Sequence, residues 1–132
     1  MTNHARYLSE AWFGLNLAAA SGWPERPGVD CTANVEVTGA PEGKVRYHLV
    51  IRDGRLVEMA LGKLSEADVA MVYKYADARD EVAEGSHPDL AYMTGRMKLE
   101  GDYARWVFGL RELLDSAEYA DFRAAAAEFT EF

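Results

Sequence analysis

The chain has 132 residues, a formal net charge of −8 and an apolar content of 49%, which together predict one globular domain with a substantial core. The acidic charge argues against nucleic-acid binding, because a phosphate backbone attracts a basic surface. No apolar run reaches the roughly 18 residues of a membrane span, so we expect no integral membrane association. The one cysteine, Cys31, cannot form an internal disulfide. We expect a buried or half-buried thiol and a reducing, cytoplasmic location.

The first half of the chain predicts a helix followed by three strands. Residues 8–22 have helical character, with Ser9 as the cap and an end at Gly22. After a proline-rich connector, apolar and polar residues alternate over residues 32–38, 44–52 and 55–61. Alternation with a period of two is typical of half-buried strands. The short connections between these segments are rich in glycine and proline, which predicts turns.

The turn between the second and third strands decides which side chains share a face. A two-residue loop, Asp53-Gly54, would place apolar residues opposite polar ones in a regular hairpin. A three-residue loop, residues 52–54, separates the two faces, and we therefore expect that register. It pairs Ile51 with Arg55, Leu49 with Val57, Tyr47 with Met59 and Val45 with Leu61.

The second half predicts a further strand, two short helices, a last strand and two longer helices. Residues 66–75 fit a strand, with Val69, Met71, Tyr73 and Tyr75 on one face, although their number also allows a helix. Residues 76–85 and 87–95 fit short helices, and residues 96–101 fit a strand. One amphipathic helix is expected from Asp102 to residue 116, and another over residues 117–129. This order predicts an α+β fold with helices covering one face of a sheet.

The segment GRMKLEGD, residues 95–102, resembles the closing signature of the sterol carrier protein type 2 family, also called the sterol-binding domain family. The segments IRDGRLVEM, EADVAMVYKY, EVAEG and HPDLAYMTG precede it in the same order as in that family. The resemblance covers roughly residues 30–114. The residues that match the signature directly are Gly95, Met97, Lys98, Gly101 and Asp102, and their expected role is architectural.

This resemblance implies a five-stranded mixed sheet, an apolar cavity between the sheet and its helices, and a single domain over residues 1–132. The domain would consist of an N-terminal helix (1–22), a core (30–114) and a C-terminal helix (115–132). Such domains carry sterols, fatty acids, fatty acyl-CoA or similar lipids without chemistry. We therefore expect an apolar ligand, no cofactor, and either a monomer or a homodimer.

Apolar and aromatic side chains of these segments could line such a cavity, or could fill a closed core at ordinary packing density. A bulky change such as Met97→Trp is expected to block ligand uptake if the cavity exists. The candidate ligand-binding residues are Trp12, Phe13, Leu17, Tyr47, Leu49, Met59, Met71, Tyr73, Tyr92, Met93, Met97, Trp106, Val107 and Leu110.

Residues of catalytic or metal-binding type do not form a familiar motif in this sequence. His48 is expected to oppose Glu58, which suits a general base in principle but fits a solvated surface pair better. The acidic run of residues 77–84, with Asp80 and Glu81 at its centre, is expected to be a solvated helix face. We therefore predict no catalytic residues and no metal site.

Two other functions stay open at this point. A small cavity enzyme of the cyclase or isomerase type could act on a polyketide or terpenoid, with Tyr47, Tyr73 or Tyr92 polarising a bound oxygen. A protein-interaction subunit could instead dock through an exposed Trp23 or through aromatic residues of the C-terminal segment, Phe129 and Phe132.

Overall fold

The computed structural model describes residues 3–132, and its central feature is a five-stranded sheet with the strand order β4-β3-β2-β5-β6. The parallel pairing of β2 with β5 lies between antiparallel pairs, so the sheet is mixed. The α+β fold with a five-stranded mixed sheet is therefore confirmed. The strands are β2 (Cys31–Ala40), β3 (Gly43–Arg52), β4 (Arg55–Leu61), β5 (Val69–Lys74) and β6 (Met97–Gly101).

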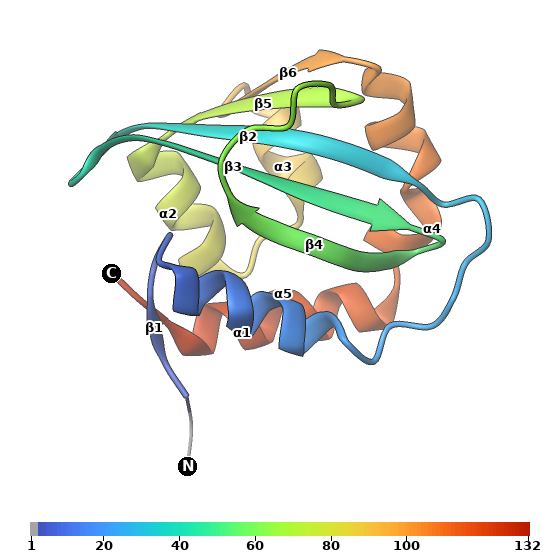
Figure 1. Ribbon diagram of the computed structural model, residues 1–132, viewed down its shortest axis with the longest axis horizontal. Helices are drawn as coiled ribbons and strands as arrows, with labels where there is room; N and C mark the ends of the chain where they lie inside the picture. The colour runs from blue at the N-terminus through green and yellow to red at the C-terminus, as the bar shows by residue number, and fades with distance from the viewer. Residues whose placement is uncertain (1–2) are drawn as a thin grey trace.

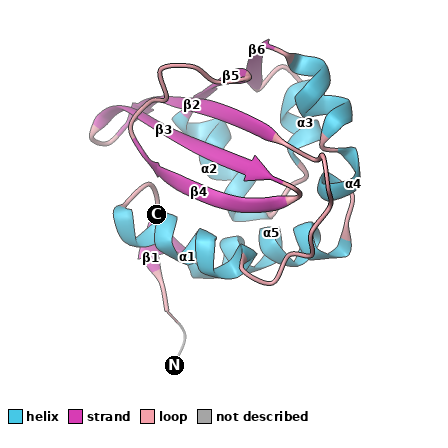
Figure 2. Cartoon of the chain, turned by 45° about the vertical axis from the view of Figure 1, so that its right-hand side comes forward, coloured by secondary structure: helices cyan, strands magenta, loops and turns pink. Residues whose placement is uncertain are grey.

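The helices gather on one face of this sheet and along its β4 edge (Figures 1 and 2). The helix α1 packs on β4 and also on α5, while α2 packs on β2, β5 and α5. No helix of the described residues is both long and apolar enough to span a membrane. The helices are α1 (Glu10–Ala20), α2 (Tyr75–Glu84), α3 (Pro88–Met93), the π-helical turn η1 (Arg105–Gly109), α4 (Arg111–Leu114) and α5 (Ala117–Phe129).

The predicted elements are confirmed along most of the chain. The hydroxyl of Ser9 caps α1 by accepting a hydrogen bond from the Trp12 amide at 3.2 Å. Residues 69–74 form the strand β5, and Tyr75 begins α2 instead of extending that strand. The assignment of residues 1–132 to one domain, with segments 1–22, 30–114 and 115–132, stays a prediction.

The predicted register of the β3–β4 hairpin is wrong. Arg52 pairs with Arg55 across a two-residue turn, in which Asp53 and Gly54 have φ angles of 48° and 76°. Positive φ at both turn residues matches the twist of a tight hairpin. A β-bulge follows directly, since Ile51 pairs with Leu56 and Val50 pairs with Glu58.

The bulge leaves Val57 outside the pairing of the two described strands and 52% exposed. One extra residue in a strand reverses the alternation of its side chains. Leu56 and Met59 therefore face the helices together, although they lie three positions apart. The bulge thus allows the tight two-residue turn and still keeps the apolar side chains of both strands on one face of the sheet. A regular hairpin with the same turn would mix the two faces.

Residues 102–116 also differ from the single regular helix that we expected. Asp102 does cap the segment, because its Oδ1 accepts a hydrogen bond from the Arg105 amide at 3.2 Å. The helix then widens into the π-helical turn η1 and continues as α4. The expected apolar stripe is present: Trp106 is 5% exposed, and Leu110, Leu113 and Leu114 are fully buried.

The two ends of the described chain lie side by side, which the sequence did not predict. The short strand β1 (Ala5–Arg6) pairs in parallel with β7 (Thr130–Glu131). Phe129 is 8% exposed and Trp23 is 4% exposed. The idea that these two aromatics are free to dock on a partner is therefore wrong, whereas Phe132 is 46% exposed.

Cys31 is buried, as predicted, with 1% of its surface exposed. Burial raises the pKa of its thiol to about 12, so the thiol stays protonated and unreactive at neutral pH.

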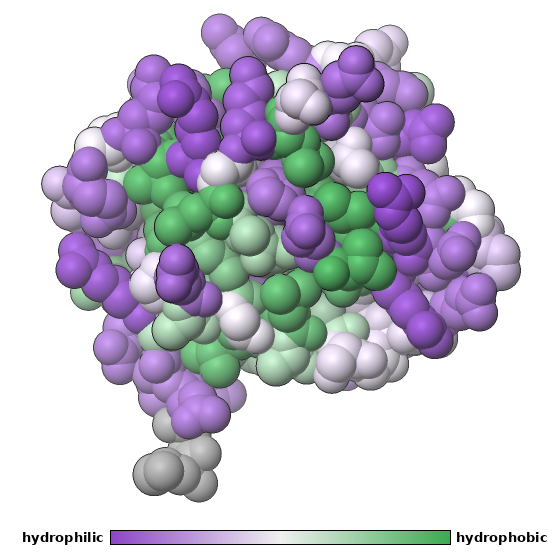
Figure 3. Space-filling model, viewed as in Figure 1, coloured by the Kyte–Doolittle hydropathy of each residue, from purple (hydrophilic) through white to green (hydrophobic). Residues whose placement is uncertain are grey.

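The face of the sheet opposite the helices is not uniformly polar. Figure 3 shows hydrophobic residues across the middle of this face, with hydrophilic residues around them. The loop after β4 lies on the same face, because Leu64 and Asn34 exchange two hydrogen bonds of 2.8 and 3.0 Å.

Gly101 tests how tightly the end of β6 is packed. A Cβ atom there would lie 2.5 Å from the carbonyl oxygen of Asp68, and the φ angle is 94°. Gly62 has a φ angle of 103° but open space around it. Alanine at either position strains the backbone by about 1–3 kcal/mol. Urea unfolding should show that Gly101→Ala lowers the free energy of unfolding by at least about 1 kcal/mol more than Gly62→Ala. Equal losses would contradict the close contact.

Candidate functional site

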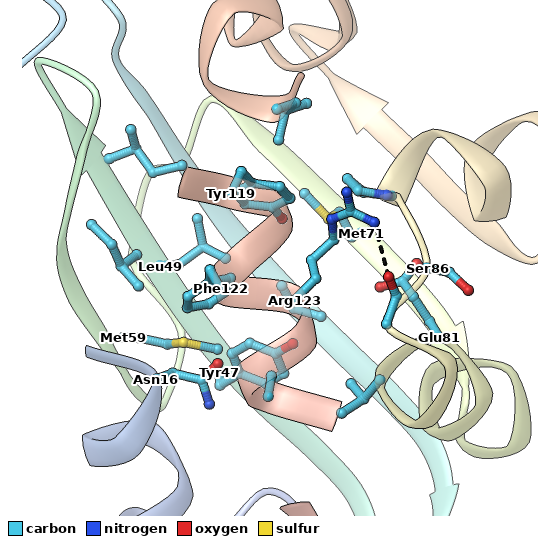
Figure 4. A pocket seen from close by; sticks show the side chains of 18 of the residues that line it. Asn16, Tyr47, Leu49, Met59, Met71, Glu81, Ser86, Tyr119, Phe122 and Arg123 are labelled. Atoms are coloured by element: carbon cyan, nitrogen blue, oxygen red, sulfur yellow. Dashed lines mark hydrogen bonds between the residues drawn. The ribbon is translucent and has the colours of Figure 1, made fainter. Parts of the chain in front are cut away.

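A cavity of about 130 Å³ lies between the inner face of the sheet and the helices α1, α2 and α5. Strands β2 to β5 form one wall, and α5 forms most of the opposite wall. Because side chains from these distant segments all face it, the core is not closed at this point (Figure 4).

Several of the predicted ligand-binding residues line this cavity. The sheet contributes aromatic, aliphatic and thioether side chains, and two tryptophans come from α1 and η1. The predicted residues at the cavity are Trp12, Tyr47, Leu49, Met59, Met71, Tyr73 and Trp106.

The other predicted residues lie elsewhere in the fold. Met97 is 2% exposed but packs in the core away from the cavity, so it is a poor position for blocking ligand uptake. Met93 is 80% exposed and Tyr92 is 37% exposed, both on α3. The remaining predicted residues outside the cavity lining are Phe13, Leu17, Val107 and Leu110, which belong to the core or pack against it.

The helix α5 supplies a wall that the sequence analysis missed. Tyr119, Phe122, Arg123 and Ala126 all line the cavity. Their spacing is i, i+3, i+4, i+7, which places them on one face of a helix. The aromatic rings of Tyr119 and Phe122 are stacked, with their centroids 5.6 Å apart. The same spacing rule, applied to residues 117–129 of the sequence, would have identified this face.

Glu81 is the one acidic residue that lines the cavity within the described part of the chain, and it corrects our expectation of a solvated acidic face. It belongs to the helical face of α2 that includes the buried Ala78 and the cavity-lining residues Val82 and Gly85. The hydroxyl of Tyr73 donates to the Glu81 carboxylate, at 3.1 Å from both oxygens. The run of residues 77–84 is therefore split between solvent and the protein interior.

Burial raises the pKa of Glu81 from its ordinary value of 4.5 to about 7, against the opposing effects of the Tyr73 hydrogen bond and of Arg123. Desolvation disfavours the charged form of a carboxyl group. Burial and the negative charge of Glu81 also raise the pKa values of the Tyr47 and Tyr73 hydroxyls. These phenols therefore stay protonated near neutral pH.

Arg123 is the cationic residue of the cavity lining. Its Nη1 atom donates to the carbonyl oxygen of Gly85 at 2.8 Å, and Figure 4 shows the side chain reaching from α5 toward Glu81 and Ser86. Its buried Nε atom has no hydrogen-bond partner among residues 3–132, and the same holds for the Trp23 Nε1 atom. A ligand with an acceptor atom could satisfy such donors.

The remaining polar clusters are structural. His48 pairs with Ala60 on β4, two residues from the predicted partner Glu58, yet its Nε2 atom lies 2.7 Å from Glu58 Oε2, so the predicted histidine–glutamate pair forms. It lies on the outer face of the sheet and does not line the cavity.

Asp89, Asp115 and His87 lie close enough together to suggest a cation site. Arg111, however, binds Asp89 at 2.8 Å and Asp115 at 3.0 Å. The ring of His87 accepts from the Asp89 amide and lies 3.0 Å from Asp115. Both ring nitrogens and both carboxylates therefore have partners, and the cluster joins α3 to the end of α4.

No family model matches the sequence, and no curated protein matches it. Solved structures do resemble it. A crystal structure of sterol carrier protein 2 has a TM-score of 0.66 at 16% identity, and the alignment covers 94% of this chain and 99% of that one. A conserved protein from Thermus thermophilus, described in relation to sterol carrier protein, has a TM-score of 0.62 at 18% identity, and the alignment covers 100% of this chain and 97% of that one.

A third structure is the palmitated form of a sterol carrier protein 2-like protein from Aedes aegypti, with a TM-score of 0.56, 16% identity and coverage of 81% and 90%. Together these likenesses show that the chain has the sterol carrier protein 2 fold. The predicted resemblance is therefore confirmed at the level of the fold.

The raised pKa of Glu81 makes the stability of the protein depend on pH. The folded chain holds the proton more tightly than the unfolded chain, so this group's contribution to stability is fully present below about pH 4.5 and is lost as the pH rises through about 7. Glu81→Gln removes the cost of burying a charge. We expect its stability advantage over the parent to be about 2 kcal/mol larger at pH 8 than at pH 5, measured by urea unfolding.

Glu84→Gln, at an exposed position one turn further along the same helix and outside the cavity lining, is the matched control for this measurement. It removes the same formal charge, so its effect should change little between the two pH values. If both variants respond to pH in the same way, Glu81 is not buried as described.

Proposed function

We propose that this chain binds an apolar small molecule or lipid in the cavity between the sheet and α5, and carries it without chemical change. The observation that carries the proposal is the cavity itself, whose wall consists mainly of apolar and aromatic side chains. Methionine and aromatic side chains make a wall that adapts to irregular ligands. We keep as proposed ligand contacts Trp12, Tyr47, Leu49, Met59, Met71, Tyr73 and Trp106, and add Tyr119 and Phe122.

The size of the cavity limits what it can hold without rearrangement. Its volume of about 130 Å³ is close to the ~150 Å³ of an engineered apolar cavity that holds benzene. A small ring or a short alkyl segment would fit as the side chains now stand. Because each buried methylene contributes roughly 0.8 kcal/mol, a longer lipid would gain affinity only where widening the cavity costs less than this gain.

The fold supports this proposal. Sterol carrier protein 2 structures share the architecture over nearly the whole chain, and one of the similar proteins was solved in a palmitated form. A fatty acyl chain can therefore be bound by a protein of this fold.

The carrier function is preferred here over the enzymatic alternative. Of the three tyrosines considered for an enzyme, Tyr92 lies outside the cavity. Tyr47 and Tyr73 do line it, and their raised pKa values keep both hydroxyls protonated, so they can donate hydrogen bonds to a bound ligand but are poor bases.

A leucine in the cavity wall provides the test. Leu49 is half-buried and lines the cavity, so Leu49→Trp places a large indole in the space that we assign to the ligand. We expect this change to weaken the binding of a fluorescent fatty acid at least tenfold, which corresponds to about 1.4 kcal/mol. The measurement is a fluorescence titration of purified protein after removal of co-purified lipid.

Leu99→Trp is the control, because Leu99 is a half-buried strand leucine outside the cavity lining. Its affinity should stay within about twofold of the parent. The proposal fails if the two variants bind equally well, or if the parent protein binds no apolar probe and native mass spectrometry finds no lipid on it.

A further inference from the structure

The cavity has a polar end within its apolar lining. Glu81 and Arg123 lie there on facing helices, α2 and α5, and Figure 4 shows them at the same end of the cavity. Tyr47, Tyr73 and Tyr119 also line this cavity, and the hydroxyl of Tyr73 donates to Glu81. Burial, and after it the charge of Glu81, raises the pKa values of all three phenols. The polar side chains that a bound apolar molecule could contact are therefore concentrated at this end of the cavity.

This polar end has hydrogen-bonding capacity left over. Of the three phenols, only that of Tyr73 hydrogen-bonds to Glu81 within the described part of the chain. The Nε atom of Arg123 is buried, and among residues 3–132 it finds no acceptor. A buried donor without an acceptor costs free energy, so a ligand atom that accepts from Arg123 would be favoured.

Ionisable groups from several elements surround the Glu81 carboxyl group. Tyr73 comes from β5, and Tyr47 comes from β3. Glu81 also lines a shallow second pocket, together with other residues of α2, with residues of α3 and with Arg96, directly before β6. The ionisable groups near Glu81 are Tyr47, Tyr73, Tyr119 and Arg123 in the cavity lining, Tyr7 outside it, and Asp77, Glu84 and Arg96 at the second pocket.

We propose that Glu81 makes the cavity select an apolar molecule whose polar group is a neutral hydroxyl, against an anionic head group on a chain of equal length. This selectivity rests on the proposed function, because it assumes that an apolar ligand occupies the cavity. Glu81 is then the residue that determines head-group specificity.

A hydroxyl can hydrogen-bond to Glu81 and to Arg123 at the same time, because it is both a donor and an acceptor. It donates its proton to the Glu81 carboxylate, and its oxygen accepts from the Arg123 guanidinium group or from a tyrosine hydroxyl. An anionic head can accept from Arg123 but has no proton for Glu81 and is repelled by its charge. The charge of the Glu81 carboxylate thus selects against an anionic head group. Binding specificity often depends on such a repulsive interaction with the wrong ligand.

The selectivity depends on the protonation of Glu81. The pKa of Glu81, raised by burial to about 7, means that the carboxylate is charged at pH 8.5 and mostly neutral at pH 6. At the lower pH this repulsion of an anionic head group is lost. Binding of an anion should therefore tighten as the pH falls, whereas binding of an alcohol should change little.

The experiment compares dodecan-1-ol with dodecane-1-sulfonate, whose sulfonate stays ionised at both pH values. Each displaces the neutral dye Nile red from the parent protein, from Glu81→Gln and from the control Glu84→Gln. The measured quantity is the ratio of the two affinities. At pH 8.5 we expect this ratio, alcohol over sulfonate, to fall about tenfold in Glu81→Gln and to stay within twofold in Glu84→Gln.

The parent protein alone gives a second measurement, which needs no variant to fold. Its affinity for the sulfonate should rise about tenfold between pH 8.5 and pH 6. An equal ratio in the parent and Glu81→Gln, with both ligands bound, overturns the role of Glu81 and leaves the carrier function standing. Binding of neither ligand to the parent overturns both proposals.

Discussion

The separation of α5 from the sheet is the constraint on which the cavity depends. α5 is held at both ends by the N-terminal part of the chain. At its start, Glu118 pairs with the nearly buried Arg26 at 3.1 Å. At its end, the hydroxyl of Thr130 accepts a buried hydrogen bond of 2.8 Å from the Trp12 indole, and β1 pairs with β7. Because α1 and α2 flank it, α5 spans the sheet without collapsing onto it.

The strands and helices could be predicted because local patterns and global packing agree in them. Alternation over residues 44–52 and 55–61 gave the strand bounds of β3 and β4 as they are found, within one residue. The β3–β4 register could not be predicted in the same way, because the alternation pattern distinguishes only between regular hairpins, which have no bulge. The chain combines a tight Asp53-Gly54 turn with a bulge at Val57. A bulge is decided by which side chains the helices cover, and residues 10–20 and 117–129 provide that cover from far away in the sequence.

The candidate site was predictable where it lies on strands and less so where it lies on helices. Met59, Met71 and Tyr73 follow from alternation alone, since every second residue of a strand shares a face. Met93 and Tyr119 show the opposite case: both belong to helices with mixed composition, and which face turns inward depends on how the helix is docked. The i, i+3, i+4, i+7 set on α5 was visible in the sequence, but only the position of α5 over the sheet makes it a cavity wall.

Glu81 shows how the packing of a helix changes the environment of one of its side chains. On an isolated helix its carboxylate would be hydrated, and the apolar neighbours Ala78 and Val82 would carry the packing. Once α2 packs against β2, β5 and α5, the same face closes over the cavity and the carboxyl group loses water, which raises its pKa to about 7. A glutamine of the same shape could keep a hydrogen bond with Tyr73 without the desolvation cost of a charge. An ionisable group kept at such a cost, in the wall of an apolar cavity and near the half-buried Arg123, is more easily understood as a means of discriminating between ligands than as a means of holding the fold together.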